Sequence, residues 1–180
     1  MAYTASFSAR ENTSGLSAYE GLHFMVGFMQ NEYKIISIDD GIDLNIFIAT
    51  KELANIRIQY PDGKKNVFQM GPDTLHQEIV STSYECRDTS EAILHNGISI
   101  DSDVPLTVYC FSSQDLTSDS YSAIPVTNWG HEYIVVSQPN NYYDEKDQLG
   151  NITTIIRNSE FMVLASYDDT KVKILLSEDT

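Results

Sequence analysis

The fold is decided by the stretch Asn55-Ile-Arg-Ile-Gln-Tyr-Pro-Asp-Gly-Lys64, in which apolar and polar side chains alternate up to a turn. Ile56, Ile58 and Tyr60 point to one side of an extended strand, and the polar residues between them point to the other. The proline that follows fixes φ, and the glycine accepts a positive φ. The stretch therefore predicts a β-hairpin with one face in a core and one face in water.

Similar short strands recur every ten to fifteen residues, and no long window has the 3.6-residue period of a helix. The chain is therefore predicted to be all-β, as an antiparallel β-sandwich. The predicted strands are Leu22–Met29, Leu44–Thr50, Asn55–Tyr60, Lys65–Met70, Leu75–Val80, Ile98–Ile100, Leu106–Phe111, Glu132–Ser137, Asn151–Ile156, Glu160–Ser166 and Lys171–Leu176.

Two parts of the chain resemble each other. Gly21–Asn31 aligns with Gly130–Asn140, and Ile48–Ile58 aligns with Leu164–Ile174, with Asn141–Gly150 as a longer connector in the second copy. This internal repeat predicts that the sandwich is built from repeated units. Propeller-like or solenoid-like stacking of repeats is the alternative.

The repeat also divides the chain. Residues 1–20 form an N-terminal extension, residues 21–129 the first β repeat unit, and residues 130–180 the start of a second, truncated unit. Further domains of a longer parent chain are therefore expected.

The charge excludes several partners. Lys and Arg number 11 against 26 Asp and Glu, so the net charge is −15. An acidic chain lacks the basic surface that nucleic acid requires, and no apolar run approaches the ~18–20 residues of a membrane span. We expect neither nucleic-acid binding nor membrane insertion.

Catalytic motifs are absent from the sequence. The histidines at 23, 76, 95 and 131 form no metal-binding pattern, and no Gly-x-Ser-x-Gly motif is present. Acidic turns leave a weak calcium site as a hypothesis, with Asp101 and Asp103 as its candidates. We otherwise expect no enzyme activity, no metal and no cofactor.

Cys86 and Cys110 are too few for a disulfide scaffold and too far apart in sequence for a metal knuckle. One disulfide between them is a hypothesis, and the alternative is that Cys110 is a buried thiol in an apolar strand.

Four consecutive motifs carry a family resemblance. They are Gly97–Tyr109, Ser112–Pro125, Trp129–Ser137 and Phe161–Ile174. In this order the chain resembles the N-terminal domain of the IgGFc-binding protein, over roughly residues 21–174. The resemblance implies a secreted or cell-surface adhesion module that binds a protein or glycan, in a mucus-like setting, without catalysis.

The Ser/Asp-rich stretch Ser112–Ser122 is predicted to be a surface loop, where binding residues are usually placed. Gln114, Asp115, Asp119 and Tyr121 are the candidate ligand contacts.

Asn12 and Asn151 each begin an Asn-x-Ser/Thr triplet, the acceptor pattern for N-glycosylation of a secreted glycoprotein.

Two other functions remain open. One is a carbohydrate-binding accessory module of an enzyme, in which Trp129, Tyr121, Tyr142 and Tyr143 would stack on sugar rings. The other is a structural spacer in a repetitive array.

Overall fold

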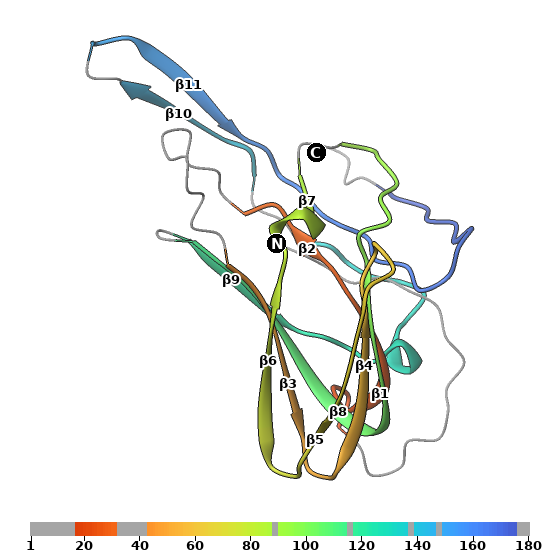
Figure 1. Cartoon of the computed structure of the whole chain (residues 1–180). Coiled ribbons are helices and arrows are strands. Elements are labelled where there is room, and N and C mark those ends of the chain that lie inside the picture. Colours follow the sequence, from red (N-terminus) through yellow and green to blue (C-terminus); the bar gives the residue numbers. More distant parts are fainter. Residues whose placement is uncertain are drawn as a thin grey trace.

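The hairpin predicted around the Pro-Asp-Gly turn is present in the computed structural model, which describes residues 17–31, 43–87, 90–114, 117–136, 139–146 and 149–175 (Figure 1). β4 (Ala54–Gln59) pairs antiparallel with β5 (Lys65–Met70). The Tyr60 amide donates to the Lys64 carbonyl over 2.9 Å, and Gly63 has a φ of 85°. This positive φ explains why the turn contains glycine.

The hairpin continues beyond β4 and β5. β3 (Asp43–Thr50) pairs with β6 (Thr74–Val80), and Thr50 faces Thr74 just as Ala54 faces Met70. The number of residues from Thr50 to Ala54 equals the number from Met70 to Thr74, so one register runs through both strand pairs. The hairpin is therefore a single long ribbon, interrupted at residues 51–53 and 71–73.

β8 (Ile98–Ser113) is the central strand of the sheet. Its first half lies between β4 and β1 (Gly21–Val26), and its second half lies between β3 and β9 (Ser118–Ser122). The sequence predicted two separate strands here. In the structure they form one continuous strand. Pro105 is tolerated within it because residues 103–105 have no strand partner, so its missing N–H interrupts no ladder.

The ribbon of β3 to β6 and the central strand β8 bend at the same place, so the sheet forms two layers (Figure 1). One layer is β5-β4-β8-β1 and the other is β6-β3-β8-β9, with β8 passing through both. In Figure 1, β3 and β6 lie on one side and β4 and β1 on the other, with the bends at the bottom of the view. The predicted antiparallel, sandwich-like all-β fold is confirmed.

The inward side chains of both layers form one buried cluster, as expected for strands with one wet face. Its largest members are Phe24, Val26, Leu44, Ile46, Ile48, Ile56, Ile58, Ile98, Ile100, Leu106 and Val108.

Four short features lie outside this sheet. Gly27 separates β1 from β2 (Phe28–Met29), and β2 pairs in parallel with β7 (Glu85–Cys86). The 3-10 helix η1 (Thr82–Tyr84) leads into β7, and η2 (Val126–Asn128) follows β9.

Two segments predicted to be loops are strands. The predicted loop Ser112–Ser122 is mostly the hairpin of β8 and β9, with Ser112 opposite Asp119. In the predicted connector, β10 (Asn141–Lys146) pairs with β11 (Ile152–Arg157) as a separate hairpin, seen at the upper left of Figure 1. β9 and β10 are polar, and each is stabilised by a pairing that its own local sequence does not reveal.

Three other predictions were wrong in the residues that the structure describes. Residues 132–136, 160–166 and 171–175 contain no strand. Their counterparts in the first copy all pair with β8, and the described part of the second copy contains no equivalent of that strand. Leu164 instead packs with Trp129 and Val126 in a small second cluster.

Candidate binding surface

The predicted ligand contacts do not form a common site. Tyr121 is partly buried, and its hydroxyl donates to the Gly27 carbonyl over 2.8 Å and accepts from the Gly27 amide over 3.1 Å. Burial raises the pKa of Tyr121 well above its ordinary value. Gln114 is buried, Asp119 is exposed, and Asp115 lies outside the described residues. Tyr121 therefore fixes β9 against the chain between β1 and β2.

A small pocket does lie beside Tyr121. Its walls include Gly27, Cys110, Ser112 and Asp119, and its volume is about 70 Å³. Small-molecule sites usually enclose ≈300–1,000 Å³, so this pocket is small for such a ligand.

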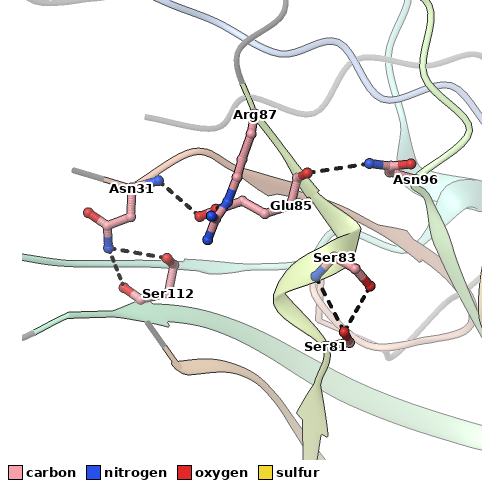
Figure 2. Close-up of polar contacts among 7 residues, drawn as sticks. All are labelled: Asn31, Ser81, Ser83, Glu85, Arg87, Asn96 and Ser112. Atoms are coloured by element: carbon pink, nitrogen blue, oxygen red, sulfur yellow. Dashed lines mark hydrogen bonds and ion pairs between the residues drawn. The ribbon is translucent and has the colours of Figure 1, made fainter. Parts of the chain in front are cut away.

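A buried polar network lies at the end of the sandwich opposite the bends (Figure 2). The Glu85 carboxylate is buried and accepts from the Asn31 amide over 3.0 Å and from Nε of Arg87. Nδ2 of Asn31 donates to the carbonyl of Ser112 over 3.3 Å and to its hydroxyl over 3.2 Å. Nδ2 of Asn96 donates to the Glu85 carbonyl.

This network joins β7, the chain after β2, and β8. A buried carboxylate requires such donors, because an unpaired charge in a low-dielectric interior is strongly destabilising. Glu85 was not among the predicted site residues, because nothing in its local sequence marks it as buried. The network pairs the buried Glu85 carboxylate with Arg87 and holds these elements together.

Both cysteines are free thiols in the structure, which does not contain the hypothesised disulfide. Cys110 is fully buried in β8, and burial raises its pKa to about 12. Cys86 is half-buried in β7, where burial and then the charge of Glu85 raise its pKa. The alternative, a buried thiol at Cys110, matches the structure.

Asp101 and Asp103, the calcium candidates, already have partners. Asp101 accepts from Arg57 Nη2 over 2.8 Å and contacts His23 Nδ1 over 2.7 Å. Asp103 accepts from the amide and the side chain of Asn55. Among the described residues, no group of three or more His, Cys, Asp or Glu side chains is arranged to hold a metal ion.

Of the remaining candidates, Trp129 is buried and donates Nε1–H to the Ile124 carbonyl over 2.7 Å. Tyr142 and Tyr143 on β10 are exposed, as is Asn151 before β11. Asn12 lies outside the described residues. Trp129 therefore presents no exposed ring to a sugar, whereas Tyr142 and Tyr143 do.

The outward faces of the two layers differ in charge. The face of β5-β4-β8-β1 contains the row Val67, Arg57, Asp101 and His23. The strand registers place only uncharged side chains across the middle of the other layer, and we call this surface the uncharged face. Its residues are Asn45, Phe47, Ala49, Leu75, Gln77, Ile79, Thr107, Tyr109, Phe111, Ser120 and Ser122.

The uncharged face is apolar at its centre. The rings of Phe47 and Phe111 meet edge to face, with centroids 5.2 Å apart. Leu75 and Ile79 on the edge strand β6 are 64% and 75% exposed. Gln77 Nε2 donates to Asn45 Oδ1 over 2.8 Å, which holds both amides against the sheet. This surface was not predicted from the sequence.

Comparison with protein-family models, curated proteins and solved structures finds no match to this chain. In the part of the chain that the structure describes, no helix is both long and apolar enough to cross a membrane.

Proposed function

We propose that this protein is a non-enzymatic binding module of an extracellular setting, and that the uncharged face contacts a protein ligand. The family resemblance of the sequence supports an adhesion role. The observation that carries the proposal is the exposure of Phe111, Tyr109, Leu75 and Ile79 on one rigid sheet face.

The composition of this face is that of a protein interface. Interface centres are depleted in Asp, Glu and Lys and enriched in aromatic residues, with polar groups at the rim. The chain has a net charge of −15, yet the face defined above has no charged side chain. Contiguous exposed apolar side chains on a sheet also favour aggregation unless a partner covers them. The charge of the rest of the molecule disfavours a second copy as that partner.

The test is a biosensor titration with two immobilised probes, immunoglobulin Fc, which the family resemblance suggests, and purified mucin. Phe111→Ser with Ile79→Ser is the test variant. Val67→Ser is the control, since Val67 is 68% exposed on β5, in the other layer. We expect the unchanged chain and the control to bind one probe alike, and the test variant to bind it at least about tenfold more weakly.

Equal binding by the test variant and the control would contradict the role of the uncharged face. Binding of neither probe by the unchanged chain would favour the structural-spacer function. The extracellular setting is tested separately, by intact mass of protein secreted from eukaryotic cells, where we expect a glycan on Asn151.

A glycan platform is the second candidate function. Exposed Tyr142 and Tyr143 on the β10–β11 hairpin favour it, since aromatic side chains can stack on sugar rings. Glycan-array binding that Tyr142→Ala abolishes and Phe111→Ser does not change would support this function over the protein interface.

A further inference from the structure

Asn96 and Gly97 form the only Asn-Gly pair in the sequence. In such a pair the backbone nitrogen of glycine can attack the side-chain amide carbon of asparagine. Glycine has no Cβ atom to hinder the approach, and its backbone adopts conformations that other residues avoid. Each of the other asparagines is followed by a residue with a side chain. The pair therefore identifies Asn96 as the most reactive asparagine by sequence.

The Gly97 nitrogen lies in an irregular segment of the chain. Residues 92–97 belong to no helix or strand, residues 91–95 are exposed, and Asn96 is half-buried. Within the described part of the chain, the Gly97 amide donates no hydrogen bond. The peptide unit between Asn96 and Gly97 can therefore rotate without breaking a strand ladder.

The Asn96 side chain is held by a long hydrogen bond. Its Nδ2 donates to the carbonyl of Glu85 in β7 over 3.4 Å (Figure 2). The usual N–H···O distance is ≈2.9–3.0 Å, so this contact restrains the amide only weakly. Both reacting groups, the side-chain amide and the following nitrogen, are thus free to approach each other.

Asn158 provides a contrast within the same chain. It is exposed and precedes Ser159, which has the smallest side chain that follows any of the other asparagines. The Ser159 amide donates to Oδ1 of Asn140 over 2.7 Å. The nitrogen that would attack Asn158 is therefore held by an acceptor, whereas the nitrogen that would attack Asn96 is not.

We infer that Asn96 is a site of spontaneous covalent modification, at which it is converted to aspartate and isoaspartate. The Gly97 nitrogen loses its proton and bonds to Cγ of Asn96, and the Cγ–Nδ2 bond breaks and releases ammonia. The product is a succinimide ring, and water is the only co-reactant that opens it. Hydrolysis of the new Cγ–N bond gives aspartate. Hydrolysis of the original peptide bond gives isoaspartate, whose main chain runs through Cγ.

Both products disturb the junction between β7 and β8. A carboxylate at position 96 cannot donate to the Glu85 carbonyl and places negative charge beside its oxygen. Isoaspartate also lengthens the main chain by a methylene group just before Ile98, which is fully buried in β8. The space is narrow here, since a Cβ atom at Gly97 would lie 3.0 Å from Sδ of Met25. The modified protein is therefore less stable than the original chain.

The test ages the full 180-residue chain in mildly alkaline buffer and follows every asparagine by peptide mass spectrometry. Fragmentation of the peptide backbone distinguishes isoaspartate from aspartate. Asn96→Gln is the first control, because the longer side chain would have to close a larger, less favourable ring. Gly97→Ala is the second, because it keeps Asn96 and hinders the attack, and the Met25 atom that its Cβ meets is the end of a flexible side chain.

We expect Asn96 to be converted before any other asparagine, with isoaspartate among the products, while Asn158 stays unmodified over the same period. Neither control variant should be converted at position 96 in that time. Asn96→Asp mimics one product, and its melting temperature should be a few degrees below that of the fresh, unchanged chain.

The inference is overturned if Asn96 keeps its amide while other asparagines lose theirs. It is also overturned if Asn158 reacts as fast as Asn96, or if Gly97→Ala leaves the rate at Asn96 unchanged. Equal melting temperatures for Asn96→Asp and the fresh, unchanged chain would contradict the effect on the junction between β7 and β8.

Discussion

Tyr121 shows how one hydroxyl group fixes the position of neighbouring strands. It satisfies both the amide and the carbonyl of Gly27, which joins β1 to β2. Tyr121→Phe leaves two buried backbone groups without their partner, and we expect a loss of roughly 1–3 kcal/mol in the free energy of unfolding. Urea denaturation measures it. Tyr142→Phe, at an exposed position, should leave the stability unchanged.

Asp101 makes stability depend on pH. Burial raises its pKa, but hydrogen bonds and charges from Arg57 and His23 outweigh burial and hold the pKa below its ordinary value. The ionised carboxylate therefore contributes stability above the unfolded-state pKa of ~3.9, which is lost as pH falls through the lower folded-state pKa. Asp101→Asn should lose stability at neutral pH and show a flatter acid limb in melting temperature against pH.

Arg57→Gln provides an independent check on Asp101, because it removes one partner and keeps the carboxylate. It should flatten the same part of the profile. If the curves of melting temperature against pH for both variants run parallel to that of the unchanged chain, the contribution of Asp101 to the pH dependence is refuted.

The Cys110 thiol should react far more slowly in the folded protein than in the unfolded protein. Burial raises the pKa of Cys110 to about 12, so little thiolate exists at pH 8. We expect iodoacetamide to leave Cys110 unmodified in native protein and to modify both cysteines in denaturant, as read by peptide mass spectrometry. A non-reduced mass lower by two hydrogens would instead restore the disulfide hypothesis.

At the scale of elements, β1 and η2 meet at a contact that only glycine allows. A Cβ atom at Gly21 would lie 2.5 Å from Cβ of Pro125, which is fully buried before η2. Gly21→Ala must displace one of these elements, and we expect a cost of about 1–3 kcal/mol. Gly71→Ala is the control, since its nearest atom would be 3.9 Å away. Thermal melts of both variants compare the two positions, and equal melting temperatures would contradict the contact.

The sequence predicts an element well when alternation alone specifies it. β3 to β6 lie close to where the sequence placed them, because each buries one face. β9, Ser-Asp-Ser-Tyr-Ser, has little strand character, and its pairing with β8 decides its conformation. Residues 171–175 show the converse, since they alternate but have no strand partner.

Strand pairing also decides which residues form the candidate surface. Tyr121 was selected from its polar neighbours, whereas its burial depends on β1 and β2, far away in sequence. The uncharged face had a signal, because Phe47, Tyr109 and Phe111 are apolar at outward positions of their strands. Only the register of β3 against β8 brings those positions together.

At the scale of the whole molecule, we expect protection from amide hydrogen exchange to differ between two parts of the chain. β3, β4 and β8 contribute to one continuous ladder around a common core, and residues 161–165 and 171–175 belong to no ladder. We expect amide exchange of the first group to be slow and of the second to be fast. Hydrogen exchange of the chain alone measures this, and uniform protection from residue 43 to residue 175 would contradict the division.

The position of β8 in the sequence has a consequence for synthesis. The ribbon of β3 to β6 is complete by residue 80, but the strand that pairs with its β3 and β4 edge and completes the core ends at residue 113. At ≈5–20 residues per second, the ribbon waits roughly two to seven seconds for that strand to be translated, and longer for it to leave the ribosome. During this interval the nascent chain exposes Ile46, Ile48 and Ile56, so the order of the strands makes β8 the point at which a vulnerable intermediate becomes a folded protein.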